Sequence, residues 1–148
     1  MDQVLVFLLG EERCALEVAH IQEIVESPPF YYIPLAPAVF PGAINFHGSI
    51  LPVVDLGACL GGTGNPRDGR IIVLAAALCT LALAVTAIQR IVALDPDDLL
   101  PARITGPLAD FSRAAFSLDD EMINLLDAAR LVASLEKIEM GTGGGHGG

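Results

Sequence analysis

The sequence from Phe40 to Leu56, FPGAINFHGSILPVVDL, contains two short apolar runs on either side of His47-Gly48-Ser49. A glycine-containing break of this length between β-prone runs predicts a tight hairpin. Gly42 begins the first predicted strand, Asp55 ends the second, and an apolar turn follows from Leu56 to Leu60. The polar residues of this stretch crowd the turn and the strand ends, where a partner could contact them: Asn45, His47, Ser49 and Asp55.

The chain has 148 residues, of which 53% are apolar and 18% are charged. This length fits one domain or two very small ones, and the apolar content is enough to form a core. The formal net charge of −10 argues against nucleic-acid binding, which needs Lys and Arg to displace counterions. The same charge is compatible with a partner that carries a basic patch.

Three cysteines, Cys14, Cys59 and Cys79, stand at spacings that fit neither a zinc site nor a disulfide framework. We interpret them as small buried residues in a reducing compartment. The N-terminal residues lack the positive region and the cleavage site of a signal peptide, so the predicted location is the cytoplasm.

The run from Ile71 to Ile88 has 18 residues, of which only Thr80 and Thr86 are polar. Its length is at the lower limit for a helix that spans a membrane. Two fully buried strands joined as a hairpin would also read as unbroken apolar sequence. A repeat in the chain decides between the two interpretations.

When the sequence is shifted by 67 residues, positions 4–34 match positions 71–101 at 10 of 31 places. At a shift of 72, residues 50–56 resemble residues 122–128. Two copies of one unit are therefore predicted, each with three strands, a proline-bounded loop, and a hairpin that ends in Asp before a short helix. Because residues 71–88 correspond to the first hairpin of the chain, we predict a hairpin there, with its turn near residues 77–80, and no membrane helix.

Local signals complete the predicted order of elements. A bulge or short helical turn is expected near residues 19–20, one helical turn at 95–101, and a helix at 127–138. The glycine-rich loop at 61–69 is the predicted boundary between the copies. The acidic stretch at 119–121 is interpreted as a hairpin tip rather than a metal site, and residues 141–148 as a flexible Gly-rich tail.

These residues resemble a CheW-like domain, the family of chemotaxis coupling proteins. The resemblance is carried by Ile21-Gln22-Glu23-Ile24, by Pro37, and by the string Gly-x-x-Asn-x-x-Gly-x-x-x-Pro-Val-x-Asp-Leu from Gly42 to Leu56, and it covers residues 3 to about 136. It implies a mainly β fold of two five-stranded SH3-like barrels packed together, with short helices and a C-terminal helix. One domain is expected over 1–140, made of halves at about 1–65 and 66–140, with exchange of strands between the halves left open.

The resemblance also implies the work of a non-enzymatic adaptor. Such proteins join the cytoplasmic helical tip of a membrane chemoreceptor to the regulatory domain of a CheA-type histidine kinase, beside receptor arrays in the cytoplasm. The kinase domain is itself CheW-like, so barrel ends are expected to meet, and weak homo-association is compatible with this; no cofactor, metal, nucleic acid or membrane insertion is expected. The receptor helix is expected to dock in the groove between the barrels, near the residues that match the partner-binding positions of the family: Ile21, Gln22, Glu23, Ile24, Gly42, Asn45, His47, Gly48, Val85 and Ile88.

The chain departs from the family pattern at three places. His47 replaces an Arg of the family, which removes a permanent charge and a rigid fork of donors. Val85-Thr86-Ala87-Ile88 stands for Val-Asp-Gly-Val, and Asn124 lies inside a strand where an apolar residue is usual. These changes indicate a divergent member, compatible with a role in motility or in signalling outside ordinary chemotaxis.

Other interpretations of the same residues remain open. His47 could be an exposed turn residue and Glu23 a solvated charge, whereas Asn45 and Asp55 are expected to cap turns. His20, His47 and His146 have no catalytic partners in sequence context, so an enzyme is not expected. The competing functions are a regulatory module that binds a small ligand, favoured by a closed polar cavity, and a self-associating module.

Overall fold

The computed structural model describes residues 2–26, 28–32, 40–59, 69–77, 80–102 and 107–135. The predicted 141–148 tail and most of the 61–69 loop lie outside these ranges. The strands in order are β1 (Asp2–Leu9), β2 (Glu12–Glu17), β3 (Ile21–Glu26), β4 (Gly42–Phe46), β5 (Ser49–Asp55), β6 (Arg70–Leu74), β7 (Ala82–Ala84), β8 (Ala87–Leu94), β9 (Ser112–Leu118) and β10 (Glu121–Leu126).

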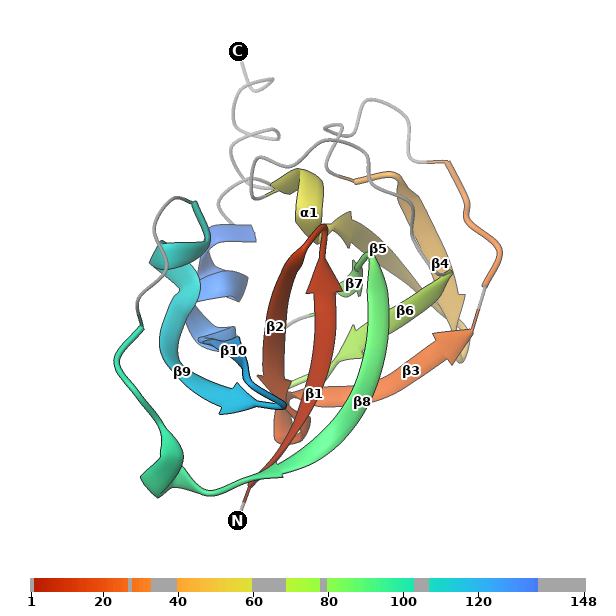
Figure 1. Cartoon of the computed structure of the whole chain (residues 1–148). Helices are drawn as coiled ribbons and strands as arrows, with labels where there is room; N and C mark the ends of the chain where they lie inside the picture. The colour runs from red at the N-terminus through yellow and green to blue at the C-terminus, as the bar shows by residue number, and fades with distance from the viewer. Residues whose placement is uncertain are drawn as a thin grey trace.

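Short helices join or follow the strands. They are η1 (Val18–His20), α1 (Leu56–Cys59), η2 (Pro96–Asp98), η3 (Pro107–Phe111) and a last helix that includes residues 128–135. The strands form two curled five-stranded sheets, with the order β8-β1-β2-β10-β9 in the first barrel and β3-β6-β7-β5-β4 in the second (Figure 1). The predicted mainly β fold of two five-stranded units is confirmed.

Neither barrel is built from one half of the sequence. The first barrel takes β1 and β2 from the first copy and β8, β9 and β10 from the second, and the other barrel takes the reverse set. The exchange occurs at the third strand of each copy, because β3 pairs with β6 and β8 pairs with β1. The predicted halves, about 1–65 and 66–140, therefore do not correspond to the two barrels.

The two barrels nevertheless repeat each other residue by residue. Each barrel has one pair of parallel strands, which is β2 with β10 in the first barrel and β7 with β5 in the second. In the first of these strand pairs Leu125 is opposite Ala15, and in the second Val53 is opposite Ala82. The shifts of 67 and 72 residues found in the sequence convert one pair into the other, so the repeat describes equivalent positions in space.

Three apolar clusters form the core. One lies inside each barrel, and a larger one lies between the barrels and includes both η3 and the last helix. Strand alternation assigns neighbours to different clusters: Val4 and Val6 face the inside of the first barrel, while Leu5 and Phe7 face the shared cluster. Both faces of the central strands are thus buried, which explains their continuous apolar sequences.

The second apolar block forms the predicted hairpin. Strands β6 and β7 pair antiparallel, and the pairing extends past β7 because Leu74 N donates to Leu81 O at 3.2 Å. In the described part of the chain, no helix is long and apolar enough to cross a bilayer. The predicted turn at 77–80 fits this pairing, although residues 78 and 79 lie outside the described ranges.

Helix ends follow the predicted caps. Asp95 precedes η2 and its side chain accepts a hydrogen bond from Asp97 N at 3.0 Å. Asp55 Oδ1 accepts from Ala58 N at 3.1 Å, and Asp127 Oδ1 accepts from Arg130 N at the same distance. Asp55 is expected from the sequence to cap a turn of the hairpin, and it caps the start of α1 instead, just as Asp127 caps the start of the last helix.

Cys14 lies in the shared cluster with 0% of its surface exposed. Burial, with a smaller contribution from the charge of Glu12, raises the pKa of its thiol from 9.0 to about 12. The unfolded thiol loses its proton above pH 9 while the folded one keeps it. The free energy of unfolding should therefore fall with rising pH above 9, by up to about 1.4 kcal/mol per pH unit.

Urea unfolding of the chain and of Cys14→Val between pH 8 and 10.5 measures this effect. All other residues are the same in both proteins, so the difference between the two slopes isolates Cys14. If the free energy of unfolding fell equally with pH in both proteins, burial would not raise the pKa of the Cys14 thiol.

Candidate functional site

The tip of the β4–β5 hairpin is a two-residue loop, His47-Gly48. Phe46 pairs with Ser49 below it, and both loop residues have positive φ angles, 50° and 87°. This is the backbone that primed hairpin turns require. A Cβ on Gly48 would meet nothing within 4 Å, so glycine is favoured there by backbone angle and not by space. Asn45 Oδ1 accepts from Gly48 N at 3.0 Å, which confirms the predicted turn-capping role of Asn45.

This tip contacts the strand at the opposite edge of the second sheet. His47 Nε2 lies 3.4 Å from Glu23 Oε1 on β3. The two side chains are 72% and 48% exposed, so the contact is a weak one by the standards of surface ion pairs. Because β3 and β4 are the two edges of the sheet, the Glu23–His47 contact closes the second barrel on its outer side.

The first barrel has an equivalent contact, in which the basic residue lies on the strand and the acidic residue at the hairpin tip. Arg90 on β8 pairs with Asp119 at the tip of the β9–β10 hairpin. Arg90 occupies the position equivalent to Glu23, and Asp119 the position equivalent to His47. The predicted hairpin tip at 119–121 is confirmed, with Asp119 and Asp120 at positive φ. The two barrel ends therefore share a backbone shape and differ in chemistry.

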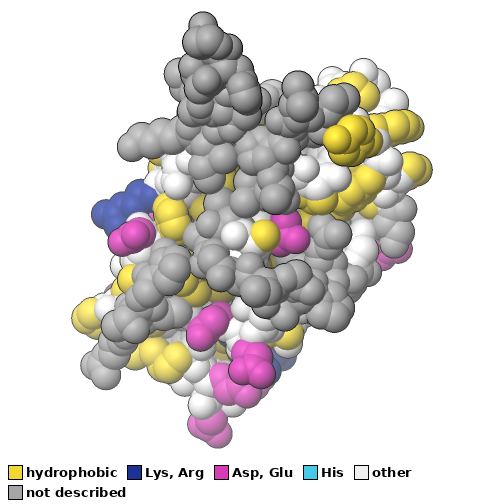
Figure 2. All heavy atoms as spheres, turned by 90° about the horizontal axis from the view of Figure 1, so that it is seen from above, with side chains coloured by type: hydrophobic (Ala, Val, Ile, Leu, Met, Phe, Trp, Pro, Cys, Tyr) yellow, Lys and Arg dark blue, Asp and Glu magenta, His cyan; other side chains and the backbone are white. Residues whose placement is uncertain are grey.

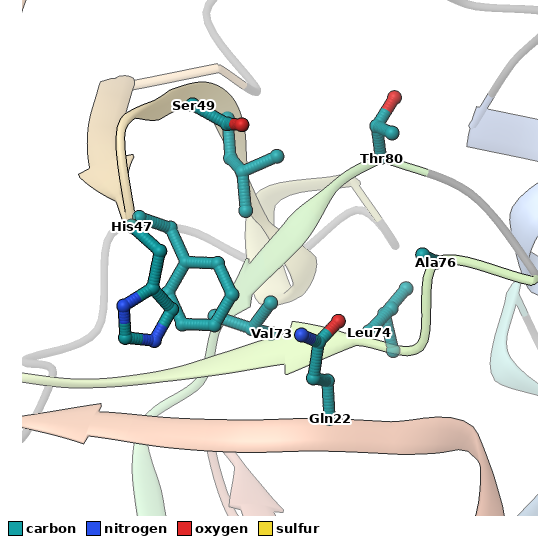
Figure 3. A pocket seen from close by; sticks show the side chains of 9 residues that line it. Gln22, His47, Ser49, Val73, Leu74, Ala76 and Thr80 are labelled. Carbon is teal, nitrogen blue, oxygen red and sulfur yellow. The ribbon is translucent and has the colours of Figure 1, made fainter.

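Next to the Glu23–His47 contact the surface of the second barrel has a hollow of about 250 Å³ (Figure 3). Three exposed polar side chains form its rim. Gln22 reaches toward the hollow from β3, and Ser49 and Thr80 lie across the hollow from Gln22. Its remaining lining is the imidazole of His47 and apolar groups of Phe46, Leu51, Val73, Leu74 and Ala76.

The chemistry of the hollow suits binding. An apolar lining accepts an apolar group, and the amide and hydroxyls of the rim can bond to polar atoms beside that group. Within the described ranges, no three His, Cys, Asp or Glu side chains gather in a way that could hold a metal ion. The described titratable groups next to the hollow, Glu23 and His47, pair with each other.

The edge of β4 carries a second feature that sequence reasoning missed. Tyr31 and Ala43 exchange two backbone hydrogen bonds of 2.8 Å, which covers the start of this edge. Figure 2 shows apolar side chains gathered on the side of the molecule where β4 lies. The exposed large apolar residues of this part of the fold are Phe30, Tyr31, Tyr32 and Ile50, which are 40–81% exposed. The sequence signal for Ile50 was its alternation with the buried Leu51.

The structure brings together five of the predicted partner-binding residues, which lie near the Glu23–His47 contact: Gln22, Glu23, Asn45, His47 and Gly48. Ile21 and Ile24 are half-buried and pack against the shared cluster. Gly42 is buried at the other end of β4.

Val85 and Ile88 do not join this group. They are 1% and 7% exposed and belong to the shared cluster, because the link from β7 to β8 passes between the barrels. As placed here they support the core and offer almost no surface to a partner.

Known proteins share this architecture. The family model described as CheW-like domain matches residues 3–136. A probable chemotaxis protein CheW of Rhizobium etli is 26% identical over 90% of this chain and 89% of its own length, and a chemotaxis protein CheW of Treponema pallidum is 27% identical over 90% and 84%. The crystal structure of the scaffolding protein TtCheW from Thermoanaerobacter tengcongensis superposes with a TM-score of 0.74 at 27% identity, covering 84% of this chain and 88% of that one.

Proposed function

Because the chain belongs to the CheW-like domain family, we propose that it is a non-enzymatic scaffold that couples a chemoreceptor to a CheA-type histidine kinase. In this proposal the cytoplasmic helical tip of the receptor binds at the hollow of the second barrel. The regulatory domain of the kinase binds elsewhere, barrel end to barrel end. The protein then works in the cytoplasm beside receptor arrays.

The names of the relatives support a scaffold function in chemotaxis. Two of them are called chemotaxis proteins, and the matched crystal structure is that of a scaffolding protein. The alignments span nearly the full length of these proteins, so the likeness includes both barrels.

The observation that carries the proposal is the gathering of family-matched residues around one hollow. Gln22 and His47 line the hollow, and Glu23 lies against His47. An apolar lining with a rim of hydrogen-bonding groups matches one face of an amphipathic helix, whose apolar anchor is flanked by polar side chains. Since both partners can be bound without a reactive group, the site needs no catalytic residue.

The pseudo-symmetry of the barrels supports a second contact. A barrel end that repeats in one chain can meet the same kind of end in a CheW-like partner. The two barrel ends carry different side chains: Glu23 lies beside His47 in the second barrel, and Arg90 lies beside Asp119 in the first. In this proposal the difference decides which end binds the receptor and which binds the kinase. Weak homo-association would use the same ends.

The competing ligand-binding function is less well supported. Pockets for small ligands usually have volumes of about 300–1,000 Å³ and enclose most of the ligand. The hollow is smaller, at about 250 Å³, and most of the polar groups around it are exposed. It suits one side chain of a larger partner better than a free metabolite.

The test is a binding assay with two partners from the same organism, a receptor cytoplasmic-tip fragment and the kinase regulatory domain. The chain is expected to bind each one and to hold both in a ternary complex. The double variant Gln22→Ala/His47→Ala should weaken the receptor complex about tenfold and leave the kinase complex unchanged. Asp98→Ala, an exposed substitution on η2, is the control. A chain that binds neither partner would refute the scaffold function.

A further inference from the structure

We propose that Ser49 and Thr80 determine the specificity of the hollow, because their small side chains keep it open for one apolar side chain of the receptor tip. This inference rests on the proposed function and concerns the same site. Ser49 stands at an unspecified position of the matched family string and Thr80 lies outside it, and both lie on the rim of the hollow (Figure 3).

The argument comes from the equivalent positions of the other barrel. Arg13 is equivalent to Thr80 and Glu121 to Ser49 at the shifts of 67 and 72 residues. The strand pairing agrees with this assignment. Glu121 pairs with Leu118 just as Ser49 pairs with Phe46, and both pairs flank a two-residue hairpin loop.

In the first barrel these two positions hold an ion pair. Arg13 Nε contacts Glu121 Oε2, and the Arg13 carbonyl also accepts a hydrogen bond of 3.2 Å from Asn124 Nδ2. The long side chains of Arg13 and Glu121 therefore occupy the positions at which the second barrel has only the short hydroxyl side chains of Thr80 and Ser49. With the same backbone underneath, the size of these side chains decides whether the surface is bridged or hollow.

The charge around the hollow indicates what flanks the apolar anchor. The side chain of Glu23 on β3 is exposed next to the hollow, and the whole chain has a net charge of −10. The position equivalent to Glu23 in the first barrel is Arg90. A receptor helix with Lys or Arg near its apolar anchor is therefore favoured at the hollow, beside Glu23.

Grafting the ion pair of the first barrel onto the second tests the inference. The double variant Ser49→Glu/Thr80→Arg should bridge the hollow. Its affinity for the receptor-tip fragment should fall by about tenfold or more, while its affinity for the kinase regulatory domain stays within about twofold. The matched control is Ala129→Glu/Ala133→Arg, which adds the same two groups at exposed positions of the last helix.

Each outcome has a distinct meaning. If the unmodified chain binds neither partner, the scaffold function itself fails. If it binds both and the graft keeps its receptor affinity, the inference is overturned and the scaffold function stands. Equal loss of both partners from a folded graft also overturns it. Should the graft not fold, Ser49→Gln replaces it as a neutral side chain of the same length as Glu, with the same expected selective loss.

Discussion

Replacement of Phe7 by alanine is expected to lower the free energy of unfolding by about 3–5 kcal/mol, the usual loss for a large aromatic side chain in a core. Phe7 is 0% exposed and lies in the cluster between the barrels. Its strand, β1, pairs with β2 on one side and with β8 from the second copy on the other. The cavity left by the substitution therefore weakens a region that belongs to both copies.

The same variant should still unfold in a single transition. The barrels exchange strands and share their largest apolar cluster, so neither can lose its structure while the other remains intact. Urea unfolding followed by circular dichroism and by tyrosine fluorescence measures both the loss and the coincidence of the two signals. Ile91→Ala, at a 51% exposed position on β8, should change the free energy by less than about 0.5 kcal/mol. Two separate transitions would contradict the shared core.

Replacement of Gly42 by alanine is expected to cost about 2–3 kcal/mol, through overpacking and weakened backbone hydrogen bonds. A Cβ at this position would lie 2.7 Å from the carbonyl oxygen of Tyr31, closer than real Cβ atoms approach. That oxygen accepts from Ala43 N at 2.8 Å, and Tyr31 N donates to Ala43 O at the same distance. Relief of the clash has to move the backbone that covers the edge of β4.

Gly57→Ala is the matched control for this variant. Gly57 lies in helix α1, and the nearest atom to its added Cβ is Asp55 Oδ1 at 3.6 Å, an ordinary contact. Because alanine favours helix more than glycine does, this change should leave stability equal or raise it by up to about 1 kcal/mol. Equal losses from both substitutions would show that the approach of Tyr31 is not what requires glycine at position 42.

The repeat could be found from the sequence because equivalent residues keep their side of the strand. Ala15 and Ala82 each face a barrel interior, and Leu16 and Leu83 each face the shared cluster. The exchange of strands could not be found in this way. A repeat specifies the order of strands within a unit, but the pairing of β1 with β8 depends on which copy supplies the nearest free edge.

The candidate site shows the same limit. The string from Gly42 to Leu56 fixed the hairpin tip and its capping by Asn45, because these depend on local backbone geometry. The burial of Val85 and Ile88 depends on the packing of two barrels, which no local pattern contains. Thr80 reaches the hollow only through the pairing of β7 with β5, and its role became visible by comparison with Arg13.

The exchanged strands also bear on how such a duplicated chain could arise. One copy alone would supply two strands to one barrel and three to the other, and each set would end in unpaired edges. A single copy could satisfy all of its backbone only by assembling with an identical chain around a two-fold axis. In this molecule a covalent connection between β5 and β6 places both copies in one chain, so the two ends need not carry the same side chains, and they do not.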